Sequence, residues 1–323
     1  MSTNRRRFLV GAGLAGFGLA GASKLVFADR SNSADENGET ASLLADAAIR
    51  NDRPLAEVAT PKSKLLLRFA AIADTGSSTK NQYAVGHAMT RYHAQKPFNT
   101  VIMVGDNIYN NGEISKIKEA FEVPYADLLK QGVKFYAALG NHDVRTANGD
   151  RQVEYPQFNM QGKHYYTHEH AGVKFFVLET SSIVDPNSTE RATQLAWLDR
   201  ELATSKAKWN IVYGHHNIYS AGVYKVNELM RRDITPILKK HKVKLWINGH
   251  DHNYQRSKSI DGTTYLVCGG GGAHLYPVKP QPWSAFAQSI HSFGIVEVYQ
   301  DQILLTGIDS QGKIIDRGLV NLT

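Results

Sequence analysis

Five short clusters of aspartate, asparagine and histidine occur along the chain, and each contains a glycine and follows an apolar run. An apolar run of this kind predicts a buried strand, so each cluster is expected at the end of a strand, where α/β folds carry their chemistry. One such cluster can be an ordinary turn, but five together predict a metal site. The clusters are Ala73-Asp74-Thr75-Gly76, Gly105-Asp106-Asn107-Ile108-Tyr109, Gly140-Asn141-His142-Asp143, Tyr213-Gly214-His215-His216 and Gly249-His250-Asp251-His252.

These clusters offer three kinds of ligand. Too many ligands are present for one four-coordinate zinc, whereas a carboxylate shared by two cations accommodates them, and two metals about 3.5–4 Å apart are the usual device for displacement at phosphorus. Phenolate and carboxylates favour a hard trivalent ion, and an amide with imidazoles suits a borderline divalent ion. The pattern therefore predicts two unlike metals. The ligands are anionic oxygens (Asp74, Asp106, Tyr109), an amide oxygen (Asn141) and imidazoles (His215, His250, His252).

These motifs resemble those of the purple acid phosphatases within the calcineurin-like metallophosphoesterases. The resemblance covers roughly residues 65–277, and its most specific part is Tyr109 in the second cluster. Residues 249–253 and the Gln194-Leu195-Ala196-Trp197-Leu198 stretch are similar to the small tartrate-resistant type. The implied fold is α/β, with two packed mixed β-sheets flanked by helices in a four-layer sandwich and the metals at the strand ends.

The resemblance also implies a division of the ligands between the metals. A ferric ion would be held by Asp74, Asp106, Tyr109 and His252. A divalent ion (Fe2+, Zn2+ or Mn2+) would be held by Asp106, Asn141, His215 and His250, with Asp106 as the bridge. Two positions depart from the family pattern. Ala73 replaces a usual glycine, and Tyr224 stands where a substrate-binding histidine usually follows His215 by nine residues.

The predicted function is hydrolysis of small phosphate monoesters of the acid phosphatase type, by attack of a metal-bound hydroxide. His142, beside the ligand Asn141, is the candidate general acid. His216 and Tyr224 are candidates for orienting the phosphate. A tyrosine in place of histidine can donate a hydrogen bond, but it does not serve easily as an acid near neutral pH.

Two other functions fit parts of the sequence. The first is an exported phosphodiesterase or nucleotidase that uses manganese or zinc and leaves Tyr109 unligated. The second is a non-catalytic protein that binds metal or phosphate, against which the full ligand set and His142 argue. Turnover and a ferric phenolate absorption band distinguish the three functions.

The elements that position the clusters follow from the apolar periodicity. Their alternation from residue 65 onward predicts an α/β fold, with hairpin-like strands at the end that favour a mixed sheet. The tyrosine-rich stretch 164–170 is expected to contain packed histidines, and the glycine run 269–272 to be a flexible turn. Strands are predicted at 66–73, 100–104, 134–139, 174–180, 209–213, 243–247, 263–267, 293–299 and 303–308. Helices are predicted at 82–95, 115–121, 125–130, 189–205 and 227–241.

The first residues have the composition of an export signal. Residues 1–28 begin with a basic stretch, continue through a short Gly/Ala/Leu-rich segment and offer cleavage after Ala22 or Ala28; retention as an anchor is the alternative. The paired arginines followed by Phe8-Leu9 are similar to the twin-arginine type, so the partner would be that export machinery and the protein periplasmic or secreted. Residues 29–64 are predicted to be a linker or loose arm.

The catalytic domain is predicted to span 65–323, a length that buries a substantial core. The net charge of +7 includes four arginines and lysines in residues 1–28, so +3 remains after them, which indicates no nucleic-acid partner. The single cysteine, Cys268, excludes an internal disulfide. No apolar segment after the signal is long enough to span a membrane, so the mature protein is not expected to be membrane-embedded.

Overall fold

Two mixed β-sheets lie face to face in the part of the chain that the computed structural model describes, residues 58–322. These residues fall within one unit, Ala48–Thr323. The predicted export signal and most of the predicted arm lie outside the described residues. Among residues 58–322, no helix combines the length and the apolar character needed to cross a bilayer.

The first sheet has six strands in the spatial order β13-β12-β11-β1-β2-β3. Its strands β1, β2 and β3 are parallel to one another, whereas β11, β12 and β13 add to β1 as an antiparallel group. The strands are β1 (Leu65–Ile72), β2 (Thr100–Val104), β3 (Lys134–Ala138), β11 (Ser292–Tyr299), β12 (Gln302–Asp309) and β13 (Ile314–Asn321).

The second sheet has seven strands in the order β10-β8-β9-β7-β6-β5-β4. The central strands β5, β6, β7 and β9 are parallel, and antiparallel strands complete both edges. The strands are β4 (Tyr166–His170), β5 (Val173–Leu178), β6 (Trp209–Gly214), β7 (Leu245–Asn248), β8 (Tyr254–Ser257), β9 (Thr264–Cys268) and β10 (Ser284–Gln288).

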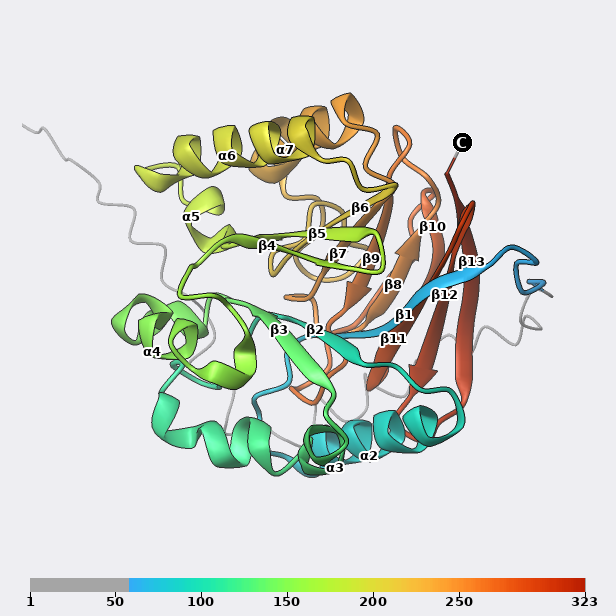
Figure 1. The fold of residues 1–323 in the computed structure, drawn as a ribbon. Coiled ribbons are helices and arrows are strands. Elements are labelled where there is room, and N and C mark those ends of the chain that lie inside the picture. Colours follow the sequence, from blue (N-terminus) through green and yellow to red (C-terminus); the bar gives the residue numbers. More distant parts are fainter. Residues whose placement is uncertain (1–57, 323) are drawn as a thin grey trace, which may run out of the picture. The chain divides into compact units, whose positions relative to one another are not determined.

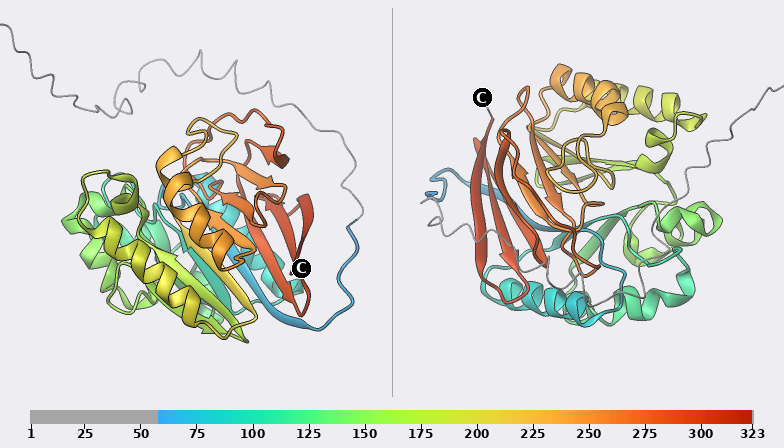
Figure 2. Two further views of the ribbon diagram at one scale, coloured as in Figure 1. Left: turned by 90° about the horizontal axis from the view of Figure 1, so that it is seen from above. Right: turned by 180° about the vertical axis from the view of Figure 1, so that it is seen from behind.

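Helices cover the outer faces of both sheets (Figure 1). Helices α2 (Lys80–Gln95) and α3 (Ala126–Lys130) lie along the six-stranded sheet, and α6 (Glu190–Thr204) and α7 (Glu228–Lys240) lie along the seven-stranded sheet. The views in Figure 2 show the same layers from above and from behind. The predicted fold, two mixed sheets flanked by helices, is confirmed.

Periodic apolar residues explain why α6 and α7 take these positions. In α7, Met230, Ile234 and Leu238 recur every four residues and are fully buried against the seven-stranded sheet. In α6, Leu198 and Leu202 are buried in the same cluster, as their spacing predicts. Short helices α4 (Asp150–Val153) and α5 (Thr180–Val184) lie in the connections that follow β3 and β5.

The two sheets are joined by aromatic side chains. Phe69 of β1 meets Phe175 of β5 edge to face, with ring centroids 5.1 Å apart. Trp209 of β6 donates its indole N–H to the carbonyl of Tyr299 in β11 at 2.8 Å. Because each contact links one sheet to the other, the strand ends of both sheets are held in a fixed mutual position.

Some predicted elements differ from the structure. The helix expected over 115–121 is wrong, because this stretch forms a 3-10 turn at Ile114–Lys116 and a π-helical turn at Lys118–Glu122. Four strands, β4, β8, β10 and β13, have no counterpart among the predicted strands, because polar residues interrupt their apolar runs. The other predicted strands and helices have counterparts in the structure, with boundaries that shift by one or two residues.

Candidate metal centre

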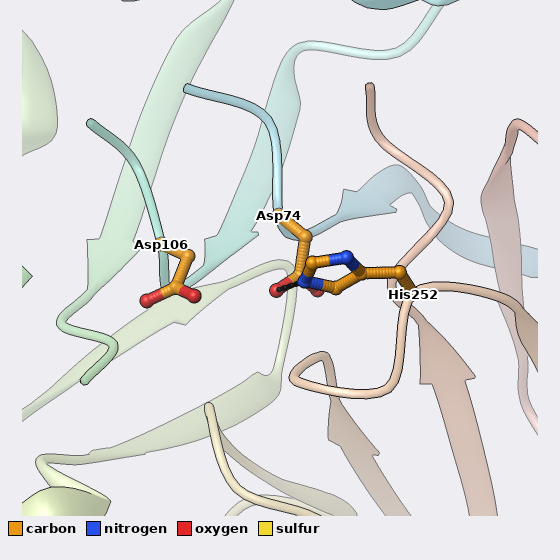
Figure 3. Close-up of side chains that lie close together, drawn as sticks. All are labelled: Asp74, Asp106 and His252. Carbon is orange, nitrogen blue, oxygen red and sulfur yellow. Dashed lines mark ion pairs between the residues drawn. The ribbon is translucent and has the colours of Figure 1, made fainter. Parts of the chain in front are cut away.

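The predicted ligands come from loops that follow the parallel strands. Carboxyl ends of parallel strands meet at one edge of a sheet, and the facing of the two sheets brings both sets of loops together. Figure 3 shows Asp74, Asp106 and His252 pointing toward one another from three such loops. The ligand atoms of these three residues lie within 4.8 Å of one another. Asp74 follows β1, Asp106 and Tyr109 follow β2, Asn141 follows β3, His215 follows β6, and His250 and His252 follow β7.

One group of donors surrounds the phenol of Tyr109. Its oxygen lies 3.1 Å from Oδ1 of Asp74, 3.0 Å from Oδ2 of Asp106 and 3.1 Å from Nε2 of His252. Four donors from three different loops therefore converge on one small volume. They are the four residues that the family resemblance assigns to a ferric ion.

A second group of donors surrounds His215. Its Nε2 lies 3.3 Å from Oδ2 of Asp106, 3.1 Å from Oδ1 of Asn141 and 3.3 Å from Nδ1 of His250. The carboxylate of Asp106 thus contacts both groups of donors, as the predicted bridging ligand must. The structure brings all seven predicted ligands together.

The backbone at three of these residues adopts the left-handed region. The φ angles are +57° at Asp74, +52° at Asp106 and +69° at His250. Residues other than glycine adopt this region at a cost of about 1–3 kcal/mol each, and such strained positions cluster at functional sites. Hydrogen bonds within the site hold the strained turns: the amide of His250 donates to Asp74 at 3.0 Å, and the amide of His142 donates to Asp106 at 3.0 Å.

The glycine run 269–272 packs against the loops that carry the ligands. The expectation that this run is a flexible turn is wrong. All four glycines are buried. A Cβ on Gly269 would lie 2.1 Å from the carbonyl oxygen of Asp251, and one on Gly271 would lie 2.2 Å from that of Ala73. The run is therefore glycine because its backbone packs directly on the loops that carry the ligands.

Burial and the carboxylates control the charges in the site. Burial opposes ionisation of Asp106, but the neighbouring His215 and His142 lower its pKa far below the usual range. Burial likewise opposes a charge on His215, yet Asp106 raises its pKa to about 10. Burial and the carboxylates of Asp106 and Asp74 raise the pKa of Tyr109 well above 10.

These properties fit a bound metal. Asp74 and Asp106 are almost completely buried, and within residues 58–322 their ion-pair partners are histidines, never lysine or arginine. Two buried carboxylates need a compensating positive charge. A cation among the oxygens provides that charge and also lowers the pKa of a ligating phenol.

The proposed general acid, His142, lies at the edge of this group. Its Nδ1 donates to the carbonyl oxygen of Asn110 at 2.6 Å, and its Nε2 lies 3.9 Å from Oδ2 of Asp106. Its ring also packs against that of Tyr109, with centroids 4.6 Å apart. The contact at Nδ1 leaves Nε2 as the ring nitrogen that faces the centre.

The two predicted phosphate-orienting residues occupy different environments. His216 is buried, its Nδ1 lies 2.8 Å from the hydroxyl of Thr180, and burial with the nearby His215 lowers its pKa to about 3. A neutral His216 with a hydroxyl at Nδ1 presents its other nitrogen as a donor. Tyr224 is 45% exposed and its ring stacks on His250, with centroids 3.9 Å apart.

Two buried aspartates that have no predicted role hold the loops in place. Asp143 accepts backbone N–H bonds from Gly140, Asn107 and Ile108 at 2.8–3.1 Å, and so joins the loops after β2 and β3. Asp251 accepts from the amides of residues 223 and 224 and from the hydroxyl of Ser220. Both aspartates stand within the predicted clusters, but their sequence positions do not show which backbone amides their carboxylates accept from.

Comparison with known proteins identifies a family that agrees with the predicted metal centre. The sequence model of the family described as calcineurin-like phosphoesterase matches residues 67–254, more than half of the chain. The chain therefore belongs to the calcineurin-like phosphoesterases, and it is a hydrolase of that family.

Individual relatives indicate which group within this family the chain belongs to. Purple acid phosphatase 7 of Arabidopsis thaliana is 30% identical over 246 residues, which cover 69% of this chain and 75% of that protein. Tartrate-resistant acid phosphatase type 5 of Oryctolagus cuniculus is 26% identical over 302 residues, which cover 80% and 91%. Within its family the chain thus falls among the purple acid phosphatases, and the resemblance stated from its motifs is confirmed.

Solved structures show the same fold. GAP50, described as the anchor in the inner membrane complex of Plasmodium, aligns with a TM-score of 0.71 and 22% identity over 80% of this chain and 90% of that one. Purple acid phosphatase PPD1 of Lupinus luteus aligns with a TM-score of 0.65 and 20% identity over 80% and 54%.

Proposed function

We propose that this protein hydrolyses small phosphate monoesters with a centre of two metal ions, as an acid phosphatase. The observation that supports this function most strongly is the position of Asp106. Its carboxylate contacts the donor group around Tyr109 and the donor group around His215 at the same time. A carboxylate between two donor sets is the arrangement needed to hold two cations close together.

The donor chemistry supports two unlike ions. The oxygen-rich group favours Fe3+, and the group with an amide and two imidazoles favours Fe2+, Zn2+ or Mn2+. When bound, the ions would supply charge neutralisation at the phosphate and an acidified water for displacement at phosphorus. The Fe3+ ligands are Asp74, Asp106, Tyr109 and His252, and the divalent-ion ligands are Asp106, Asn141, His215 and His250.

His142 is the proposed proton donor to the leaving alcohol. The carbonyl of Asn110 accepts from Nδ1 and so fixes the ring orientation. In the imidazolium form, the proton on Nε2 faces the centre and can pass to the departing oxygen.

His216 and the hydroxyl of Tyr224 are the proposed hydrogen-bond donors to the phosphate. Gln194 in α6 pairs with the backbone of Glu179 at 2.8 and 2.9 Å, which fixes the neighbouring Thr180. Thr180 in turn contacts both the amide and the Nδ1 of His216. Burial raises the pKa of Tyr224 well above its usual value, so its phenol keeps its proton and remains a donor.

The mature protein is proposed to act outside the cytoplasm. The basic start of residues 1–28, with its paired arginines and short apolar segment, supports export through the twin-arginine machinery to the periplasm or the medium. That route carries folded proteins, which suits a chain that binds its metals before export.

Hydrolysis of p-nitrophenyl phosphate by the purified protein tests the function. We expect turnover with an acidic optimum, loss of activity on chelation and recovery on adding iron with a divalent metal. Bis-p-nitrophenyl phosphate, a diester, should react much more slowly. A colourless manganese or zinc enzyme that prefers the diester would instead indicate the phosphodiesterase, and no turnover of either ester would indicate a binding protein.

A further inference from the structure

Two tyrosines cover the outer faces of two predicted metal ligands. The ring of Tyr224 stacks on that of His250, with centroids 3.9 Å apart and planes inclined by 26°. The ring of Tyr276 stacks on that of His252, with centroids 4.2 Å apart and planes inclined by 8°. The two tyrosine rings lie 6.0 Å apart at 66°, so together they form an aromatic corner beside the centre.

This aromatic corner, Tyr224 with Tyr276, faces solvent. Tyr224 is 45% exposed and Tyr276 is partly exposed, although the imidazoles beneath them belong to the metal centre. The neighbouring Val223 is 46% exposed. Large apolar side chains on a rigid loop at the edge of a site present a surface that ligands can cover.

Backbone hydrogen bonds fix the loops that carry both rings. The amides of Val223 and Tyr224 donate to the carboxylate of Asp251 at 3.2 and 3.3 Å. The amide of Tyr276 donates to the carbonyl of His252 at 3.0 Å, and that of Lys279 donates to the carbonyl of residue 221 at 2.8 Å. The two loops are thus tied to the ligand loop and to each other, and the corner is preorganised.

We propose that this corner binds the leaving group of the substrate and that the preferred substrates are phosphate monoesters of aromatic alcohols. The inference rests on the proposed phosphatase function and adds the class of leaving group. The organic group of a phosphate held at the centre would extend toward solvent, and on the solvent-exposed side of His250 and His252 the two rings offer offset and edge contacts to a planar group. A saturated ring of similar size lacks the flat π face needed for the same contacts.

Benzyl phosphate and cyclohexylmethyl phosphate form a matched pair for the test. Both release primary alcohols, so the comparison isolates the shape of the ring. For the metal-loaded enzyme we expect kcat/KM to favour benzyl phosphate by about tenfold. Tyr276→Ala should lower this ratio to near one, and Tyr224→Ala should lower it at least threefold. Tyr276→Phe, which keeps the ring, should leave it unchanged.

The ratio of kcat/KM for the two esters distinguishes a loss of aromatic selectivity from a loss of metal and from a failure of the proposed phosphatase function. A variant that binds less metal loses activity on both esters equally, so its ratio stays informative. A wild-type ratio near one, or a ratio that neither alanine substitution changes, would contradict the proposed role of the aromatic corner. Neither result would contradict the proposed phosphatase function. If the metal-loaded wild type hydrolyses neither ester, both the function and this inference are wrong.

Discussion

At the scale of single residues, the chemistry depends on how closely the ligand atoms of the site approach one another. Tyr109 illustrates the effect, because its phenol lies within 3.1 Å of two carboxylates and an imidazole. In such surroundings the phenol loses its proton only to a strongly positive ion. If the protein binds Fe3+ as proposed, its colour is expected to depend on this one residue.

Tyr109→Phe should abolish the visible absorption of the iron-loaded enzyme. The reason is that the expected band would come from charge transfer between the Tyr109 phenolate and Fe3+, and phenylalanine has no oxygen. The measurement is a visible spectrum together with iron analysis of each sample. Tyr224→Phe is the matched control and should keep the band. A band that persists at full iron content in Tyr109→Phe would show that another group supplies the colour.

His142→Ala should lower kcat by about 100-fold or more, with little change in metal content. Loss of a general acid matters most when the leaving group is a poor one, so glycerol phosphate should suffer more than p-nitrophenyl phosphate. Kinetics with both esters and metal analysis of the same sample check this. His87→Ala, an exposed histidine on α2, is the control. Equal loss of turnover and metal would contradict the proposed role.

The types of the site residues could be predicted from sequence, but the supporting residues could not. Asp74 and His215 stand in clusters next to glycine at strand ends, a local pattern. The roles of Asp143 and Asp251 depend on which backbone amides their carboxylates face, and Tyr276 stands in no cluster at all. The direction in which each of these side chains points follows from loop geometry, which a single sequence does not specify.

At the scale of elements, the site depends on how closely neighbouring loops approach. The glycine run 269–272 lies between β9 and the loop after β1, and its amide at Gly271 donates to the carbonyl of Ala73 at 3.1 Å. Composition alone cannot distinguish such a packed glycine run from a mobile one. This is why the sequence predicted its presence after a strand but not its packing.

Gly271→Ala should lower the free energy of unfolding by about 3 kcal/mol, because the new Cβ would meet a backbone oxygen that cannot move aside. Gly172→Ala is the comparison. Gly172 has φ of +77° and no atom within 4 Å of the position that a Cβ would take, so only backbone strain of about 1 kcal/mol is expected. Urea unfolding of both variants measures the difference. A cost at Gly271 no greater than at Gly172 would contradict the close packing.

At the scale of the whole molecule, the α/β class could be predicted because the long strands and helices are strongly periodic. The edges of the sheets could not be predicted fully, since β8 and β10 are short and polar and gain their stability from pairing. The histidines expected to pack in the stretch 164–170 include His168, which is buried between the rings of Tyr136 and Phe175.

His168 makes the stability of the fold depend on pH. Burial, with the nearby His170, lowers its pKa well below 6.5. The unfolded chain therefore takes up a proton near pH 6.5 that the folded chain does not, and stability is present above this pH and falls below it. The maximum slope for one proton is about 1.4 kcal/mol per pH unit.

His168→Phe should shrink the difference in unfolding free energy between pH 7.5 and pH 5 by about 2 kcal/mol. The substitution keeps the stacked ring, although it lowers stability at both pH values by removing contacts to His170 and Tyr213. Urea titrations at the two pH values measure the change, and His87→Gln should behave as the wild type. An unchanged difference in His168→Phe would show that this histidine is not the cause.

Asp106 is proposed to join two metal ions in one centre, and elemental analysis of the purified protein tests this role most directly. We predict two metal ions per chain in the wild type, at least one of them iron, and a loss of more than half of the total in Asp106→Asn because both donor groups lose an anionic oxygen. A wild-type content of one metal per chain, or an Asp106→Asn variant that keeps both ions, would contradict it.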